Sequence, residues 1–185
     1  MDPLINLNQP ALFIDRDGVI NVEKNYVYQI ENFEFLNGIF DLCRAATDKK
    51  MPIVVVTNQA GIGRGYYTES EFHALTAWMM RRFEVESTPI AAVYFCPYHP
   101  EHGIGPYRRE SFDRKPNPGM LLRAKADLSL DMSRSILIGD KCSDILAGKA
   151  AGVGTTILLG SDVENSNPNW VVSSLHEALH LICEL

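Results

Sequence analysis

The sequence predicts an α/β fold, a doubly wound and mostly parallel sheet flanked by helices. Three observations indicate it. Short apolar runs rich in β-branched residues recur along the chain, helical patterns separate them, and polar residues directly follow several runs. The runs are continuous instead of alternating, which is typical of strands buried on both faces of a parallel sheet. Alternation of strand and helix indicates the doubly wound arrangement.

Six apolar runs are expected to form the strands, and five helical patterns lie between or after them. The strands are expected at 11–15 (ALFID), 52–57 (PIVVVT), 90–96 (IAAVYFC), 135–140 (SILIGD), 155–159 (TTILL) and 170–173 (WVVS). The helices are expected at 38–49, 68–84, 118–128, 143–151 and 174–184. The second helix opens with Thr68-Glu69-Ser70-Glu71, a capping-box signature, and Gly152 follows the fourth as a C-cap.

The composition is that of an ordinary globular protein. The chain has 185 residues, enough for one domain with a sizeable core but short for two, so we expect 1–185 to form a single domain. Apolar residues make up 46% and charged residues 22%. The net charge of −6 argues against nucleic-acid or membrane-surface partners, since both need a basic face. An anionic substrate would need local positive charge or a metal ion.

The cysteines and the apolar segments indicate a cytoplasmic location. The four cysteines are scattered, without a CxxC pair or a dense framework, which is typical of reduced thiols. The N-terminus, MDPLINLNQPALF, lacks the basic and apolar regions of a signal peptide. No run approaches the ~20 apolar residues of a membrane-spanning helix. The lack of a long apolar helix face beyond the needs of the core favours a monomer.

Polar residues follow three of the four strands whose ends would meet at one edge of the sheet. Asp15-Arg16-Asp17, Thr57-Asn58-Gln59 and Gly139-Asp140-Lys141 are polar, whereas Cys96-Pro97 is not. Ligands of doubly wound sheets bind at the carboxyl ends of the strands. Each feature alone has an ordinary explanation, since loop carboxylates are usually solvated or cap helices. Their common position favours a functional site.

The residue types at this edge suit phosphoryl transfer. Clustered carboxylates repel each other unless a cation intervenes, and Mg²⁺ prefers oxygen ligands, so Asp15, Asp140 and a backbone carbonyl near Asp17 are expected to hold Mg²⁺. Asp15 is a candidate nucleophile that forms an aspartyl-phosphate, and Asp17 a candidate acid and base. Thr57 and the following N–H groups are expected to hold phosphoryl oxygens, and Lys115 to add positive charge. Taken alone, Lys115 reads as a surface lysine and Asp144 as a helix cap.

Four motifs resemble those of the haloacid-dehalogenase-like (HAD-like) superfamily, in order, spacing and strand context. They are DRDGV at 15–19, VVVTN at 54–58, RKP at 114–116 and GDKCSD at 139–144. Within that superfamily, NVEKNYVYQIENFEFLNGI and TNQAGIGRGYYTESEF resemble the D-glycero-D-manno-heptose 1,7-bisphosphate phosphatases, to which the histidinol-phosphate phosphatase domain is related.

The resemblance implies a role for each matching residue. Asp15 would be the nucleophile and Asp17 the acid and base; Asp15, the Asp17 backbone and Asp140 would bind Mg²⁺. The residues implied to bind the transferring phosphoryl group are Thr57, Asn58 and Lys115. The residues implied to contact substrate are Glu23, Lys24, Asn25, Tyr26, Gln59, Arg114 and Lys141. Arg114 is the candidate for the phosphate that is not cleaved, because an arginine fork suits an anion.

The implied activity is Mg²⁺-dependent hydrolysis of the C7 phosphate of D-glycero-D-manno-heptose 1,7-bisphosphate, in the synthesis of lipopolysaccharide or capsule heptose. Hydrolysis of histidinol phosphate or another small phosphate monoester is the alternative, and Arg114 and the 22–34 loop would decide between them. A non-catalytic ligand-binding protein on the same fold is the alternative from another class. The presence of every catalytic residue type argues against it.

The spacing of the motifs leaves no room for a separate cap domain, so we expect a capless enzyme. Loops near 22–34, 61–67 and 97–114 would select the substrate, and the glycines at 61, 63 and 65 suit an irregular loop. Related phosphatases often carry a zinc loop of pattern CxH…CxC. The corresponding residues here are Cys96, Tyr98, Ser111 and Asp113. We expect no zinc, because structural zinc needs about four ligands. The alternative ligand set is Cys96, His99, His102 and Asp113.

Overall fold

Six parallel strands form one sheet in the computed structural model, which describes residues 8–184. The strands are β1 (Leu12–Ile14), β2 (Ile53–Asn58), β3 (Ile90–Cys96), β4 (Ile136–Gly139), β5 (Thr155–Leu159) and β6 (Trp170–Val172). Their order across the sheet is β3-β2-β1-β4-β5-β6, and every neighbouring pair is parallel. The predicted fold class is confirmed.

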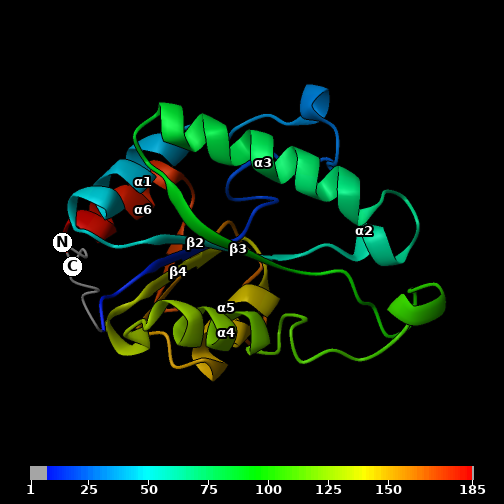
Figure 1. Cartoon of the computed structure of the whole chain (residues 1–185). Coiled ribbons are helices and arrows are strands. Elements are labelled where there is room, and N and C mark those ends of the chain that lie inside the picture. The colour runs from blue at the N-terminus through cyan, green and yellow to red at the C-terminus, as the bar shows by residue number, and fades with distance from the viewer. Residues whose placement is uncertain (1–7, 185) are drawn as a thin grey trace.

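Helices cover both faces of the sheet. They are α1 (Ile39–Asp48), α2 (Ala60–Gly63), α3 (Glu69–Val85), α4 (Gly119–Leu128), α5 (Cys142–Ala150) and α6 (Leu175–Glu184), with 3-10 turns η1 (Ile30–Asn32), η2 (Gly105–Tyr107) and η3 (Met132–Arg134). Figure 1 shows α1, α3 and α6 on one side of the sheet and α4 and α5 on the other. The five helices expected from the sequence are all present.

Strand β1 lies at the centre of the sheet and explains why its residues form a continuous apolar run. Leu12 and Ile14 pack into the core under α1, α3 and α6, whereas Phe13 packs into the core under α4 and α5. Successive side chains of a strand point to opposite faces, so a strand covered on both sides needs apolar residues at every position.

The chain changes direction between β1 and β4. From β1 it continues outward to β2 and β3 on one side, then returns across the sheet to β4, β5 and β6 on the other. Such a switch point leaves a crevice at the carboxyl ends of the two central strands. Asp15 follows β1 and Asp140 follows β4, so the fold delivers both carboxylates to this crevice.

Local capping signals position α3 and α5. The side chain of Thr68 accepts a hydrogen bond from Glu71 N at 3.2 Å, and Thr68 N donates to Glu71 Oε2 at 2.7 Å, which confirms the capping box. Gly152 follows α5 with a φ of +80°, a left-handed conformation that glycine adopts without strain.

The segment expected as an irregular loop at 61–67 begins instead with the short helix α2. The prediction that Gly61 and Gly63 lie in an irregular loop was therefore wrong, since both belong to α2. A Cβ on Gly61 would lie 2.3 Å from the Tyr67 ring, and one on Gly63 would lie 2.4 Å from the Pro97 carbonyl oxygen. These glycines serve close packing, and among the three it is Gly65 that has a positive φ, of +75°.

The described residues contain no helix long and apolar enough to cross a membrane. The expectation of no signal peptide rests partly on residues 1–7, which lie outside the described range.

The intervals in which related enzymes insert a cap domain are short here. Between β1 and β2 the only helical elements are η1 and α1, and between β2 and β3 they are α2 and α3.

The capping box generates a stability prediction. Replacing Thr68→Ala removes the side-chain acceptor for Glu71 N and should lower the free energy of unfolding by about 1 kcal/mol. Ser70→Ala, in the same turn, is the matched control and should change it by less than about 0.5 kcal/mol. Urea unfolding followed by circular dichroism measures both. Equal values for the two variants would contradict the assignment of the cap.

Candidate active site

The carboxyl ends of the central strands open into a pocket of about 670 Å³. Most residues predicted to form the site line it. These are Asp15, Asp17, Glu23, Asn25, Tyr26, Thr57, Asn58, Gln59, Arg114, Lys115 and Lys141. They come from the ends of β1 and β2, from the 22–34 loop, from the segment before α4 and from the loop between β4 and α5. The fold therefore brings the four sequence motifs to one place.

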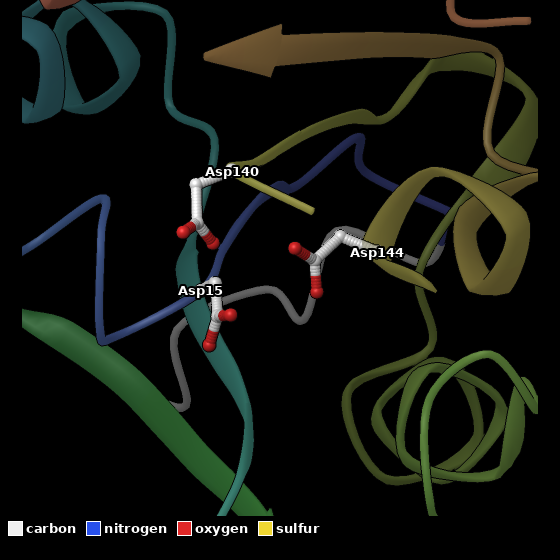
Figure 2. Close-up of side chains that lie close together, drawn as sticks. All are labelled: Asp15, Asp140 and Asp144. Carbon is white, nitrogen blue, oxygen red and sulfur yellow. The ribbon is translucent and has the colours of Figure 1, made fainter. Parts of the chain in front are cut away.

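Three carboxylates lie side by side at the base of the site. One oxygen from each of Asp15, Asp140 and Asp144 lies within 4.8 Å of the others, and Figure 2 shows the three side chains extending from different segments. Two glycines permit this. A Cβ on Gly139 would lie 2.2 Å from Asp144 Cβ, and one on Gly18 would lie 2.2 Å from Asp140 Oδ2. The glycines therefore let these two carboxylates pack against the ends of β1 and β4.

The chemistry of this carboxylate group fits a hard cation. Burial, with the nearby charges of Asp144 and Asp140, raises the pKa of Asp15 despite the opposing effect of Lys115. Burial and the charge of Asp144 raise the pKa of Asp140 to about 6. Asp140 Oδ1 is buried without a hydrogen-bond partner among residues 8–184. A divalent cation of the Mg²⁺ type suits this site for three reasons. It would offset the unfavourable negative charge, it would contact the oxygen atom that has no partner, and it prefers ligands that are all oxygen.

Lys115 lies in the middle of this negative charge. Its Nζ is 2.9 Å from Asp15 Oδ2 and 2.5 Å from Asp144 Oδ1, and it donates to the Val56 carbonyl oxygen at 2.9 Å. The residue is only 3% exposed. Burial favours the neutral amine, but the charges of Asp144 and Asp15 outweigh it and raise the pKa of Lys115. The ammonium group is therefore charged and fixed next to Asp15.

Asn58 holds the backbone of Lys115 from both sides. Its Nδ2 donates to the Lys115 carbonyl oxygen and its Oδ1 accepts from Lys115 N, each at 3.1 Å. The resemblance implies a phosphoryl contact for Asn58. The geometry shows that its amide already connects the end of β2 to the 114–116 segment, so its contribution to the site runs through the position of Lys115.

The Asp17 carboxylate is held apart from the other three. It accepts hydrogen bonds from Arg16 Nε and Nη2, from Asn21 Nδ2 and from Gln59 Nε2, at 2.9–3.1 Å. Arg16 is 1% exposed and also donates to the Val27 carbonyl oxygen at 2.7 Å. The side chain of Asp17 is thus oriented by donors on both of its oxygens, and it lines the pocket beside Asp15.

Further cationic and aromatic side chains line the pocket. Arg64, Tyr67, His99 and Ser143 line it in addition to the predicted residues. Desolvation and the charge of Arg114 lower the pKa of His99, and desolvation and the charge of Arg64 lower the pKa of Arg114. Arg64 Nε is buried without a hydrogen-bond partner among the described residues.

The turn at 25–26 presents Tyr26 to the pocket. Asn25 and Tyr26 have φ angles of +55° and +66°, a left-handed conformation that asparagine tolerates but that is costly for a bulky residue such as tyrosine. The Tyr26 ring packs edge to face on Tyr66 with centroids 4.8 Å apart, and the Arg64 guanidinium lies 5.8 Å from its centroid. Strain in this turn therefore accompanies the placement of an aromatic side chain in the pocket.

One residue expected in the site and one alternative ligand set lie elsewhere or apart. Lys24 does not line the pocket, and its Nζ instead pairs with Glu34 Oε2 at 2.8 Å on the exposed surface. Within residues 8–184, the carboxylate group above is the only cluster of three metal-ligating side chains, so Cys96, His99, His102 and Asp113 do not form one. Asp113 pairs with Arg123, and His99 Nδ1 accepts from the backbone N–H groups of Glu101 and His102.

Among the charged residues of the site, sequence reasoning did not assign Asp144 and Arg64 to it. Asp144 was read as a helix cap, and its carboxylate does accept from Lys141 N at 3.0 Å, but it also pairs with Lys115. The signal was its position in the GDKCSD motif, four residues after Asp140 in the first turn of a helix. Arg64 gave no comparable signal, because its place in the pocket depends on α2.

Comparison with known proteins agrees with this geometry. The HAD-hydrolase-like family model matches residues 112–178. A D-glycero-alpha-D-manno-heptose-1,7-bisphosphate 7-phosphatase of Burkholderia mallei is 60% identical over 80% of this chain and 79% of that protein. A D-glycero-beta-D-manno-heptose-1,7-bisphosphate 7-phosphatase of Escherichia coli is 42% identical over 90% of each.

Solved structures share the fold. The crystal structure of D,D-heptose 1,7-bisphosphate phosphatase from B. bronchiseptica, complexed with magnesium and phosphate, superposes with a TM-score of 0.82. The match covers 95% of this chain and 99% of that one, at 22% sequence identity. The arrangement of strands and helices is therefore the same in the two proteins.

The carboxylate group generates a prediction about cation binding. A divalent cation at about a hundred times its Kd stabilises the fold by about 2.7 kcal/mol, or roughly 5–10 °C in Tm for a chain of this size. We expect this shift on adding magnesium chloride to the wild type and less than about a third of it in Asp140→Asn, measured by scanning calorimetry.

Asp48→Asn, an exposed acidic residue at the end of α1, is the matched control and should keep the full shift. An equal shift in Asp140→Asn and Asp48→Asn would show that the cation binds elsewhere.

Proposed function

The chain belongs to the heptose-1,7-bisphosphate 7-phosphatase family of HAD-like hydrolases, and we propose that it hydrolyses the C7 phosphate of a D-glycero-D-manno-heptose 1,7-bisphosphate. The observation that carries the proposal is the number of cationic side chains in the pocket. Lys115 is buried beside Asp15, and the partly exposed Arg64 and Arg114 line the same pocket. A substrate with two phosphates suits a pocket that offers further cations besides the one beside the nucleophile.

In the first step a carboxylate oxygen of Asp15 attacks the C7 phosphorus. A bond between phosphorus and Asp15 forms as the bond between phosphorus and the C7 oxygen breaks, and Asp17 gives its proton to that oxygen. In the second step water attacks the phosphorus of the aspartyl-phosphate and gives a proton to Asp17. The bond to Asp15 breaks and inorganic phosphate leaves. The covalent route replaces one difficult step by two easier ones.

The side chains around Asp15 supply the electrostatic part of this mechanism. Lys115, charged and 2.9 Å from Asp15 Oδ2, attracts the transferring phosphoryl oxygens, and Thr57 at the end of β2 offers a hydroxyl on the same side. Asn58 maintains the position of Lys115. These groups are in place before substrate enters, so little reorganisation is needed.

Mg²⁺ is the proposed cofactor, and it would offset the negative charge of the transferring phosphate. Asp15, Asp140 and Asp144, with the backbone carbonyl of Asp17, are the residues that would hold it. Asp140 Oδ1, which has no hydrogen-bond partner in the described part of the chain, and the raised pKa values of Asp15 and Asp140 support this assignment.

Arg114 and Arg64 are the proposed contacts for the phosphate that is not cleaved. Arg114 Nη1 donates to the Tyr98 carbonyl oxygen at 3.2 Å, which fixes the guanidinium at the end of the 97–113 loop. Arg64 Nε has no protein partner among the described residues. Glu23, Asn25, Tyr26 and Lys141 line the same pocket and are proposed to contact the sugar.

We further propose that 1–185 acts as a single capless domain in the cytoplasm, supplying heptose for lipopolysaccharide or capsule. All four cysteines are free thiols in the structure, which agrees with a reducing compartment.

Substrate preference tests the proposed function. The wild type should cleave heptose 1,7-bisphosphate, assayed as both anomers, with a much higher kcat/KM than heptose 7-phosphate or histidinol phosphate. Arg114→Ala removes a charged hydrogen-bond donor and should lower kcat/KM for the bisphosphate by about 10- to 100-fold while changing that for heptose 7-phosphate by less than about threefold.

Arg81→Ala, an exposed arginine on α3, is the control for the loss of one positive charge. Equal kcat/KM values of the wild type for the bisphosphate and histidinol phosphate would refute the assignment of the substrate. An equal loss on both heptose phosphates in Arg114→Ala would refute the role of Arg114.

A further inference from the structure

We propose that Tyr67 and Gln59 are positioning residues that orient the Asp17 carboxylate toward the leaving oxygen. The inference rests on the proposed phosphatase function but extends it, since it assigns a task to two residues that touch no reacting atom. It also replaces the earlier expectation that Gln59 contacts substrate. Gln59 is 2% exposed, and both ends of its amide are engaged within the protein.

The Gln59 amide connects the two parts of the proposed catalytic machinery. Its Nε2 donates to Asp17 Oδ2 at 2.9 Å and to Thr57 Oγ1 at 2.9 Å. Asp17 follows β1 and Thr57 belongs to β2, so one side chain fixes the proposed acid relative to the proposed phosphoryl-binding hydroxyl. With both amide hydrogens used in this way, Gln59 has no donor left for a ligand.

The Tyr67 hydroxyl binds the oxygen end of the Gln59 amide, opposite the end that faces Asp17. It donates a hydrogen bond to Gln59 Oε1, and this leaves Nε2 on the side of the carboxylate. A rotated amide would place Oε1 against Asp17 Oδ2, and whenever Asp17 is ionised two acceptors would then face each other without a proton between them. Burial raises the pKa of Tyr67, so the hydroxyl keeps its proton.

Neighbouring side chains hold both ends of this hydrogen-bonded series, the Tyr67 ring and the Asp17 carboxylate. The Tyr67 ring stacks on the Tyr28 ring with centroids 5.1 Å apart and an interplanar angle of 7°, and Gly61 leaves the space that the ring occupies. The buried Arg16 also contacts Asp17 and donates from Nε to Oδ2 and from Nη2 to Oδ1, at 3.1 Å each. Asp17 is therefore held by donors from both Arg16 and Gln59.

The reaction itself offers a way to detect loss of orientation. A sugar alkoxide is a poor leaving group and needs the proton from Asp17, whereas p-nitrophenolate leaves without one. Because kcat/KM reports the steps up to the first irreversible transfer, misorientation of Asp17 should lower kcat/KM for a sugar phosphate but barely affect that for p-nitrophenyl phosphate. A general loss of structure would lower both values alike.

Tyr67→Phe is the central variant, since it removes only the hydroxyl. We expect kcat/KM for heptose 1,7-bisphosphate to fall by about 10- to 100-fold, part of the 10²–10⁴ that positioned acid catalysis supplies, and kcat/KM for p-nitrophenyl phosphate to fall by less than about threefold. Tyr28→Phe removes a hydroxyl from the stacked neighbour and is the matched control, with both values unchanged.

Gln59→Met, which keeps the length of the side chain without hydrogen-bonding groups, should show the same dependence on the leaving group. If Tyr67 acts through Gln59, the double variant should be no worse than Gln59→Met alone.

Three results would overturn the inference. These are equal losses on the two substrates in Tyr67→Phe, losses that multiply in the double variant, and a higher KM with unchanged kcat in Gln59→Met, which would mark a substrate contact. Should the heptose bisphosphate prove not to be a substrate, the same comparison runs with any alkyl phosphate that the enzyme hydrolyses. Failure of the proposed function is thus separable from failure of this inference.

Discussion

The site depends on the concentration of buried negative charge at the carboxyl end of the central strands. Asp15, Asp140 and Asp144 lie within 4.8 Å of one another, and burying ionised carboxylates is costly unless cations compensate them. Lys115 compensates two of them through contacts to Asp15 and Asp144. Within residues 8–184, Asp140 Oδ1 is buried without a hydrogen-bond partner, which supports the proposed binding of a cation at this position.

Other features of the molecule serve this arrangement. The glycines at 18 and 139 let the carboxylates approach the ends of the strands, and Asn58 and the Val56 carbonyl oxygen fix Lys115. Asp17 lies outside the carboxylate group and has its own donors, chiefly Arg16 and Gln59. The two aspartates of the DRD sequence, one residue apart, therefore lie in different environments: one suited to a metal and a nucleophile, the other to moving a proton.

The strands and helices could be predicted because their signals are local. A β1 strand covered on both faces must be continuously apolar, and the capping box at Thr68 and Glu71 marks the start of α3 by itself. The 60–63 helix and the place of Arg64 could not be predicted, since they depend on how Gly61 and Gly63 pack against residues distant in the sequence. The sequence predicts that Asp144 caps a helix, because the cap involves only the neighbouring Lys141. It does not predict the ion pair of Asp144 with Lys115, because that contact depends on how distant segments pack together.

The most direct test of the mechanism is to trap the covalent aspartyl-phosphate. Wild-type protein is mixed with heptose 1,7-bisphosphate and Mg²⁺, quenched within one turnover and reduced with borohydride, which converts an acyl phosphate of aspartate to homoserine. Mass spectrometry of the peptide that holds Asp15 should show homoserine at that position, and only with substrate present. An unmodified Asp15 in samples withdrawn before and throughout phosphate release, under conditions that trap an acyl phosphate added as a standard, would contradict nucleophilic catalysis by this residue.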